Sequence, residues 1–468
     1  MQSFQLISIK IRAIGFTKVL LLRKSLRAIK CKHLDRLFWE EIIMSKNDKR
    51  LIIQNGDLFD SKKGKIKKNT TIVISGREIV WVGDDGSFEK EKSDQIIKAD
   101  GKTVLPGLVE SHVHLASLCT PIYERETLRT SDTMWHYIAL NNAQKHLVSG
   151  FTCVRDCGSS PGWIASLRRA FDQGIFAGPR LVVSDNGIAQ WGNQEAVGPD
   201  VILDYYKDIG EVQTGVDGIK HAVRDRRRNG ADFIKTLTTG GVLHGQDSKL
   251  GTSLFLDEEL EAMVEEAERL GMHVAVHAHG LEGIYRAVKA GIHTVEHGSF
   301  LDEETAELMV KKGTFLVPTQ MALAGLMTSG ILEQLPLEVQ IKTKKTGEAQ
   351  KEAHRIAFEK GVKIAVGTDA GTPANFHGTT GTEVRFMVEN VGMTPTQALQ
   401  AATIVGAQCV HLDDKIGVIE KGKTADIIIS NKNPLDDISV VENPKNFSHV
   451  IKDGKIMVEK GVITYFSP

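Results

Sequence analysis

Short apolar runs alternate with helical patterns along most of the chain. Eight runs are interpreted as strands, at 104–115, 151–158, 178–185, 231–235, 273–277, 293–297, 314–320 and 363–369. Apolar residues recur at helical spacing in three stretches, each expected to end at a glycine: 256–271 at Gly271, 280–291 at Gly291 and 302–313 at Gly313. Alternation of this kind predicts βα units and a parallel sheet. Eight units in roughly 300 residues fit a (β/α)8 barrel.

Both flanks of the barrel carry shorter alternating runs, broken by glycine and asparagine turns. They lie at 50–105 before the barrel and at 422–466 after it. This pattern is typical of a small β-sandwich. We expect residues 44–105 and 415–468 to form one composite sandwich, with the barrel at 106–414.

The first 43 residues differ from the rest in charge. They contain nine Lys/Arg against three Asp/Glu, and their longest apolar stretch, VLLL at 19–22, is too short to span a bilayer. A basic segment poor in acidic residues is also found in organellar transit peptides. The interpretation we favour is an upstream start before Met44, so residues 1–43 are expected to lie outside the fold.

Composition narrows the class of protein. The 468 residues are 41% hydrophobic and 25% charged, which is ordinary for a soluble globular protein. A net charge of −1 argues against nucleic acid or a membrane surface as a partner. Five cysteines are too few for a secreted disulfide framework, so a cytoplasmic protein is expected. Cys153 and Cys157 are expected to be buried as small apolar side chains.

Candidate chemistry gathers at the ends of the apolar runs. His112 and His114 are two residues apart on a strand, so both imidazoles leave the same face, as two ligands of one metal ion must. Four other runs end on a polar residue that could join them: Lys235, His277, His297 and Asp369. Barrel enzymes carry their chemistry at the C-terminal strand ends. Histidines with an aspartate suit zinc or a similar divalent ion.

These residues, in this order, resemble the ligand set of the amidohydrolase superfamily, and the resemblance covers nearly everything from about Leu51 onward. The segments TTGG (238–241), VAVHAHG (274–280), TVEHG (294–298) and GTDAGTP (367–373) are most similar to its prolidase-like and dipeptidase-like branch. That branch is catalogued beside imidazolonepropionase and includes enzymes that cleave N-acyl amino acids such as ochratoxin. The resemblance implies a composite sandwich, a homo-oligomer and two divalent metal ions, most simply zinc. It also implies that Lys235 is carboxylated and bridges the metals.

The expected function is hydrolysis of a linear amide, in a dipeptide or an N-acyl amino acid, by a metal-activated hydroxide. Asp369 would bind metal, accept the proton of water and pass it to the leaving amine. One alternative is a cyclic amidohydrolase similar to imidazolonepropionase, and another is a metal-free scaffold. Lys235 argues against relatives that use a single metal, and the intact ligand set argues against a scaffold.

Other polar residues receive weaker interpretations. Three histidines are expected to contact the small-molecule substrate: His136, His244 and His279. No spacing selects among three candidates for a substrate carboxylate, Arg155, Tyr205 and Arg226. Two acidic residues beside ligands are expected to support them, Glu110 and Glu296. Five histidines are interpreted as ordinary surface or helix residues: His221, His273, His293, His354 and His411.

Overall fold

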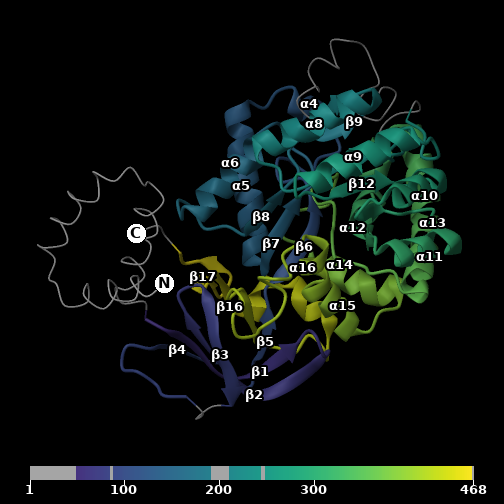
Figure 1. The fold of residues 1–468 in the computed structure, drawn as a ribbon. Helices are drawn as coiled ribbons and strands as arrows, with labels where there is room; N and C mark the ends of the chain where they lie inside the picture. Colours follow the sequence, from purple (N-terminus) through teal and green to yellow (C-terminus); the bar gives the residue numbers. More distant parts are fainter. Residues whose placement is uncertain (1–48, 85–87, 191–209, 244–247, 466–468) are drawn as a thin grey trace, which may run out of the picture. The chain divides into compact units, whose positions relative to one another are not determined.

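The computed structural model describes residues 49–84, 88–190, 210–243 and 248–465 (Figure 1). The elements below belong to one unit, Leu51–Pro468. The predicted extension 1–43 and two candidate side chains, Tyr205 and His244, lie outside the described residues. None of the described helices is both long enough and apolar enough to cross a membrane.

One sheet combines strands from the two flanks of the chain (Figure 1). Its order is β18-β17-β16-β15-β5-β1-β2-β3, and β4 pairs with β1. The strands are β1 (Leu51–Asp60), β2 (Lys65–Ser75), β3 (Glu78–Asp84), β4 (Gln95–Lys98), β5 (Thr103–Pro106), β15 (Ile427–Ser430), β16 (Phe447–Lys452), β17 (Lys455–Glu459) and β18 (Val462–Ile463). The two flanks meet where β5 pairs antiparallel with β15, with Leu105 opposite Ile428. Division of this sheet into the two layers of a sandwich, and the predicted domain boundaries, stay predictions.

The remaining strands form two parallel sheets. The first contains β6 (Leu108–Val113), β7 (Phe151–Asp156) and β8 (Arg180–Val183) in that order. The second has the order β10-β9-β11-β12-β13-β14, with β9 (Gly187–Ala189), β10 (Gly210–Val212), β11 (Ile234–Leu237), β12 (Val274–Ala278), β13 (Thr294–His297) and β14 (Phe315–Val317). Parallel pairing of strands that alternate with helices confirms the predicted mixed α/β class.

The eighth predicted strand, at 363–369, is not a regular strand. Single parallel bridges connect Ile364 with Leu316 on one side and Ala370 with Val113 on the other. Between them, the Ser111 amide donates to the carbonyl of Val366 at 2.8 Å. The segment therefore lies between β14 and β6 and hydrogen-bonds to both, without the continuous ladder of a regular strand. A closed (β/α)8 barrel stays a prediction.

The first predicted strand is divided at Gly107. Its first half is β5 of the nine-stranded sheet, and its second half is β6 of the parallel sheet. A Cβ atom at Gly107 would lie 2.1 Å from Oγ1 of Thr152, so only glycine allows this close passage between strands. At this close contact, the apolar run passes from the nine-stranded sheet into the parallel sheet.

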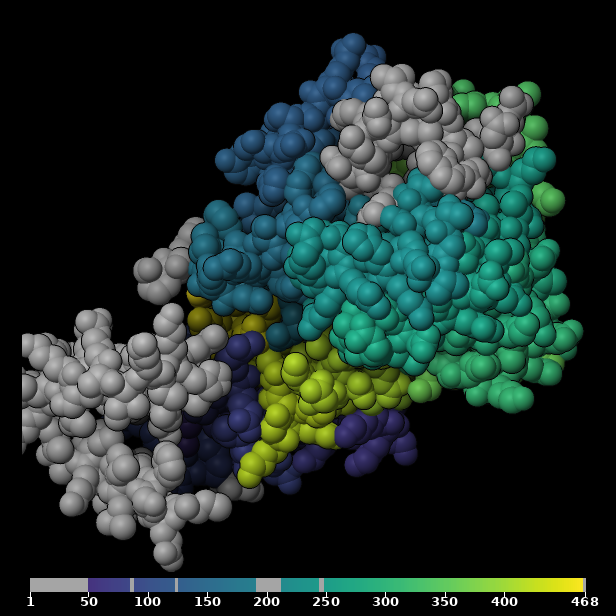
Figure 2. Space-filling view, turned by 45° about the horizontal axis from the view of Figure 1, so that its top comes forward, coloured from purple at the N-terminus to yellow at the C-terminus, as the bar shows by residue number. Residues whose placement is uncertain are grey.

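The three helices expected from periodicity are present as α9 (Asp257–Arg269), α10 (Leu281–Ala290) and α11 (Glu303–Lys312). Gly291 and Gly313 cap α10 and α11 in the left-handed conformation, as expected. Leu270 caps α9, and Gly271 follows one residue later with φ 73°. The other α-helices are α4 (Tyr123–Thr127), α5 (Asp132–Val148), α6 (Trp163–Asp172), α8 (Gly215–Asn229), α12 (Gln320–Leu326), α13 (Leu337–Lys360), α14 (Gly381–Phe386), α15 (Pro395–Ala401) and α16 (Ile404–Cys409). In Figure 2 the teal and green surface of residues from about 215 to 350 is contiguous.

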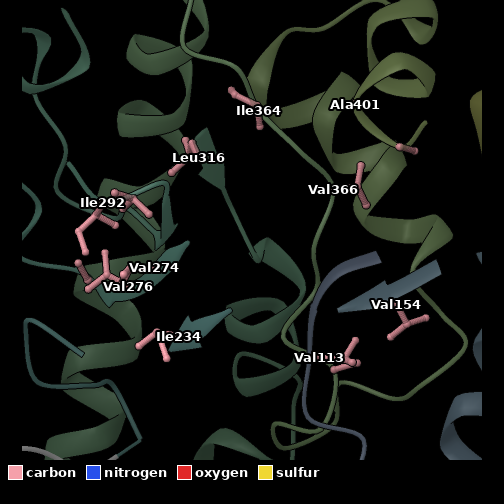
Figure 3. Packing of buried hydrophobic residues seen from close by; sticks show 14 of the residues in the cluster. Val113, Val154, Ile234, Val274, Val276, Ile292, Leu316, Ile364, Val366 and Ala401 are labelled. Carbon is pink, nitrogen blue, oxygen red and sulfur yellow. The ribbon is translucent and has the colours of Figure 1, made fainter. Parts of the chain in front are cut away.

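The main core lies between the parallel strands and their helices (Figure 3). Val113, Val154, Ile234, Val274 and Leu316 contribute side chains from five strands, and none exposes more than 2% of its surface. These residues hold β6, β7 and β11–β14 in place, and with them the polar residues at the strand ends.

Shortening Leu316 to alanine is expected to lower the free energy of unfolding by about 2–5 kcal/mol, because it removes buried methyl groups and leaves a cavity. Leu337, which is 65% exposed at the start of α13, is the matched control, and its alanine variant should change stability by less than about 0.5 kcal/mol. Urea denaturation measures both. Equal effects in the two variants would contradict the assignment of Leu316 to the core.

Candidate metal centre

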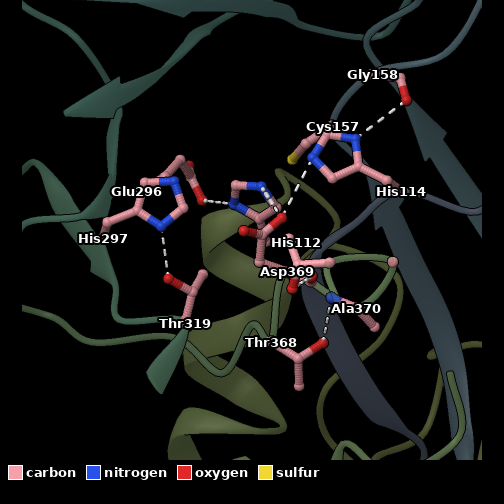
Figure 4. Close-up of polar contacts among 12 residues, drawn as sticks. His112, His114, Cys157, Gly158, Glu296, His297, Thr319, Thr368, Asp369 and Ala370 are labelled. Carbon is pink, nitrogen blue, oxygen red and sulfur yellow. Dashed lines mark hydrogen bonds and ion pairs between the residues drawn. The ribbon is translucent and has the colours of Figure 1, made fainter. Parts of the chain in front are cut away.

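His112 of β6 and His114, which directly follows β6, meet Asp369, the last residue of the 363–369 segment. Nε2 of His112 lies 3.4 Å from Oδ1 of Asp369, and Nε2 of His114 lies 3.3 Å from the same oxygen (Figure 4). One ligand atom from each of the three side chains lies within 4.8 Å of the other two. The spacing of two residues along the strand therefore brings both imidazoles to one carboxylate.

Three further histidines converge from the neighbouring strands β12 and β13. His277, His279 and His297 also offer ligand atoms within 4.8 Å of one another. The ring centroids of His277 and His297 are 4.5 Å apart. The ring of His297 lies 5.4 Å from that of His112, so the two groups of ligands are adjacent.

Lys235 is buried within β11, with 5% of its surface exposed. It is the second residue of a strand that continues to Leu237, so the expectation that it ends the strand is wrong. Burial lowers the pKa of His112 to about 4, and the positive charge of Lys235 adds to this shift. The same charge contributes to the lowered pKa of His297, although burial is the larger cause. Lys235 lies on the strand that pairs with β12, in which Leu237 is opposite His277.

Hydrogen bonds fix which ring nitrogen of each histidine carries the proton. Nδ1 of His114 lies 3.2 Å from the carbonyl oxygen of Gly158, which can only accept. Nδ1 of His297 lies 2.6 Å from Oγ1 of Thr319, whose own hydrogen is donated to the carbonyl of Pro318. Both Nδ1 atoms are therefore donors, and the Nε2 lone pairs remain for another partner.

Two buried glutamates support His112, as the sequence analysis expected. Oε2 of Glu296 accepts from Nδ1 of His112 at 2.7 Å. Oε1 of Glu110 accepts from the amides of His112 and Thr368, at 2.9 and 3.0 Å.

Burial opposes ionisation of Asp369, but the two histidines and Lys235 outweigh it and lower its pKa. Asp369 is therefore a carboxylate, and its oxygens accept.

Three residues around the candidate centre adopt the left-handed conformation: His297, Thr319 and Asp369, with φ of 72°, 53° and 59°. For residues with a side chain this conformation is uncommon, and it costs roughly 1–3 kcal/mol unless the surroundings compensate. Each residue lies just where a strand or the 363–369 segment ends. The turn that this conformation makes lets the side chain point into the shared site.

The donor set fits a divalent cation. Neutral imidazole nitrogens and a carboxylate are the ligands that zinc prefers. Nε2 of His297 is buried and has no hydrogen-bond partner among the described residues, which is costly unless a cation or water fills the position. Two adjacent groups of imidazoles, one of which includes a carboxylate, could therefore each hold a cation.

The other predicted substrate contacts lie in different surroundings. His279 belongs to the second histidine group, and its Nδ1 lies 2.8 Å from Oγ of Ser299. His136 is exposed on α5, with its ring 4.9 Å from that of Trp163. A substrate role for either residue stays a prediction. The expectation for Arg155 is wrong, because its guanidinium is fully buried.

The sequence analysis missed two residues that support His297. Thr319 bonds its Nδ1, and Nε2 of His354 on α13 lies 2.7 Å from its carbonyl oxygen. His354 is fully buried rather than an ordinary helix residue. A second missed pair is His146 and His377, whose ring nitrogens are 3.0 Å apart. The partners are 22 to 231 residues apart in sequence, and no local signal links them.

A third group of histidines lies before the start of the strands. His273 precedes β12, His293 precedes β13, and His411 follows α16. Their ring centroids are 4.3–4.7 Å apart, and the interpretation as surface residues is wrong for His273, which is buried, whereas His411 is exposed. Burial, with the charges of His411 and Arg155, lowers the pKa of His293 from 6.5 to about 3.

This shift predicts how stability depends on pH. Between about pH 3 and 6.5 the unfolded chain holds a proton on His293 that the folded chain does not, so the free energy of unfolding should fall as the pH is lowered. One such histidine contributes up to about 1.4 kcal/mol per pH unit. Replacing His293 by glutamine should make the dependence shallower, and replacing the exposed His221 should not. Denaturation curves at pH 4, 5 and 6 measure this, and equal slopes in both variants would contradict it.

Comparison with known proteins identifies the family of the chain. The model of the amidohydrolase family matches residues 103–457. The chain is 30% identical over 439 residues to ochratoxinase of Aspergillus niger, covering 90% of this chain and 89% of that protein.

Solved structures give the same result. The fold matches a crystal structure of a Xaa-Pro dipeptidase with bound methionine at a TM-score of 0.78 and 38% identity, over 88% of this chain and 100% of that one. It also matches a prolidase in complex with N-methylphosphonate-L-proline at a TM-score of 0.79 and 30% identity, over 88% and 99% of the two chains. On this evidence, the chain belongs to the amidohydrolase family.

Proposed function

We propose that this amidohydrolase binds two divalent cations, most simply zinc, and hydrolyses a linear amide bond in a dipeptide or an N-acyl amino acid. One observation carries the proposal: the structure contains two groups of possible metal ligands next to each other. His112 of one group and His297 of the other are neighbours, and Lys235 is buried beside them. Two such groups suit two cations that act on one carbonyl. The proposal includes a closed (β/α)8 barrel that presents these groups at one end.

The ligands divide between the two cations by their position. His112, His114 and Asp369 would hold one cation, and His277 and His297 the other. Bound cations supply Lewis acidity, which lowers the pKa of water and polarises the scissile carbonyl. A protonated Lys235 would repel them. Reaction of its neutral amine with carbon dioxide would form an N–C bond and release one proton to solvent, and the resulting carbamate anion would offer two oxygens as ligands for the cations.

Asp369 is placed to move the proton. One of its oxygens faces His112 and His114, and its lowered pKa keeps it ionised and able to accept. An amine leaves an amide only when it is protonated. A carboxylate that takes a proton from water and returns it to the amine performs both steps. His279, beside His277 and His297, is proposed to orient the substrate at this point.

The substrate class rests on the comparisons. The related structures are described as a Xaa-Pro dipeptidase and a prolidase, and the related curated protein as ochratoxinase. The dipeptidase and prolidase names refer to linear amides that carry a free carboxylate. Lys235 favours two cations over one, because a carbamate on it offers two oxygens as ligands, and the choice of a linear over a cyclic amide rests on the dipeptidase and prolidase relatives.

The test measures metal and hydrolysis on the full-length chain. Purified protein incubated with zinc should retain two equivalents per chain after desalting, and it should show a carbamate signal in ¹³C NMR after equilibration with labelled bicarbonate. A panel of Xaa-Pro dipeptides, other dipeptides and N-acyl amino acids should be cleaved in preference to cyclic ureides. Preference for the cyclic compounds would overturn the substrate class. Absence of bound metal would overturn the whole proposal.

A further inference from the structure

Arg155 is a charged side chain enclosed within the protein, and the proposed reaction does not use it. It is fully buried on β7, and each side of its guanidinium has a partner. Nη2 donates to Oε1 of Glu296 at 2.8 Å, Nη1 donates to Oγ1 of Thr294 at 3.2 Å, and Nε donates to the carbonyl of Ser111. The guanidinium carbon also lies 5.1 Å from the ring centroid of Phe233. Arg155 is therefore held in one orientation.

Glu296 connects this arginine to the candidate metal centre. One carboxylate oxygen accepts from Arg155, and the other accepts from Nδ1 of His112 at 2.7 Å. Both oxygens of Glu296 act as acceptors. Arginine can only donate, and Nδ1 of His112 donates when it carries the ring proton. With the proton held on Nδ1, the lone pair of His112 is on Nε2, the atom that faces Asp369.

We propose that Arg155 is a positioning residue: by occupying one oxygen of Glu296, it makes the other oxygen the fixed acceptor for His112 and directs Nε2 of His112 to the cation. This inference rests on the proposed function, because that function requires a cation bound to His112. Outer partners of histidine ligands fix the tautomer and the ring orientation, and their loss typically weakens metal binding by about 10–100-fold.

Exchanging Glu296 for glutamine separates this role from simple packing. Glutamine has nearly the same shape, but one end of its amide only donates. Arg155 can accept nothing, so it will hold the amide oxygen and turn the NH₂ group toward His112. Nδ1 of His112 must then become the acceptor, and its proton moves to Nε2, where it competes with a cation. Glu296→Gln should weaken zinc binding by about 10–100-fold.

A second substitution should reverse part of that loss. In the double variant Arg155→Met with Glu296→Gln, the Thr294 hydroxyl remains beside the amide oxygen, but a hydroxyl can accept as well as donate, so the amide can rotate and offer its oxygen to His112 again. Zinc binding should be at least about threefold tighter than in Glu296→Gln alone, a difference well above the uncertainty of a competition titration. The matched variant Arg155→Lys with Glu296→Gln keeps a donor at this position and should show no recovery. If Arg155 and Glu296 only fill space in the core, each further substitution should weaken zinc binding further. The double variant should then bind zinc less tightly than Glu296→Gln alone.

The experiment is a competition titration of zinc against a chromophoric chelator, combined with ¹⁵N NMR of histidine-labelled protein in its metal-free state. His112 should show a protonated Nδ1 in the parent chain and a protonated Nε2 in Glu296→Gln. Arg226→Met is the control for removing a buried arginine, because Arg226 donates to the backbone of Asn186 and Gly187 instead. It should leave the titration and the His112 signal unchanged.

Two results would overturn the proposal: an unchanged His112 tautomer in Glu296→Gln, or no recovery in the methionine double variant. If the double variant does not fold, the tautomer in Glu296→Gln decides alone. The tautomer is read without metal or substrate, so its outcome is independent of whether the parent chain binds zinc or hydrolyses amides. Failure of the proposed function would appear in the parent chain, and failure of this inference would appear only in the variants.

Discussion

Asp369→Asn is expected to lower kcat for the preferred amide by about 10²–10⁴-fold, the range typical for loss of a positioned acid–base group. Asparagine keeps the shape of the side chain and can still offer an oxygen to a cation. It cannot take a proton from water or return one to the leaving amine. The left-handed backbone at this position, with φ 59°, is tolerated well by asparagine, so the fold should be preserved.

Steady-state kinetics and metal content measured on the same preparation separate the two roles of Asp369. Loss of kcat with most of the zinc retained supports the acid–base role, and loss of kcat only in proportion to lost zinc restricts Asp369 to ligation. The exposed Asp413 is the matched control, and Asp413→Asn should have parental kinetics. A kcat within threefold of the parent value in Asp369→Asn would exclude Asp369 as the acid–base group.

Lys235→Ala is expected to weaken the binding of both cations by at least about 10–100-fold. This is the loss typical of removing only an outer partner of a ligand, and loss of a ligand itself should cost no less. We expect an effect of this size because Lys235 is buried, so no side chain at the protein surface can take its place. A short carboxylate such as propionate is expected to enter the space left by the side chain and to restore part of the activity, since it supplies two oxygens, as the carbamate would.

Lys235→Arg distinguishes a carbamate from a simple positive charge. Arginine keeps the charge but does not form a carbamate, since its guanidinium is effectively always protonated. The arginine variant should therefore be as inactive as the alanine variant, and propionate should not restore it. The exposed Lys351 on α13 provides the control, and Lys351→Ala should retain zinc and activity. An active Lys235→Arg enzyme would refute the carbamate. Zinc retention and hydrolysis with and without propionate give the measurement.

Local pattern predicted much of the fold. The helices α9, α10 and α11 follow directly from apolar spacing and terminal glycines, because helical periodicity and capping depend on neighbours in sequence. The run 104–115 was predicted as one strand because its apolar residues continue across Gly107, although the predicted boundary between sandwich and barrel falls at 105/106. The break at Gly107 depends on Thr152, a residue 45 positions away whose side chain leaves no room for a Cβ atom. The segment 363–369 also looked like a strand, and its irregular pairing comes from neighbours on two different sheets.

For the candidate site, the sequence identified side chains whose chemistry is visible in their own residue type and spacing. His112, His114, His277, His297 and Asp369 are ligand types at run ends, and in the structure they belong to two adjacent groups of possible ligands. The supporting residues carried no such signal. A threonine, a buried arginine and a helix histidine become relevant only through contacts across 22 to 141 residues.

The sequence by itself determined the family, the mixed α/β class and the candidate ligands, because motif identity and strand or helix periodicity are properties of short stretches of chain. Only the tertiary structure decided which nitrogen of each histidine faces the site, that Arg155 is enclosed rather than exposed, and that three histidines cluster before the strands. Proton position and charge compensation depend on donors and acceptors that distant segments bring within about 3 Å, and those distances exist only after folding.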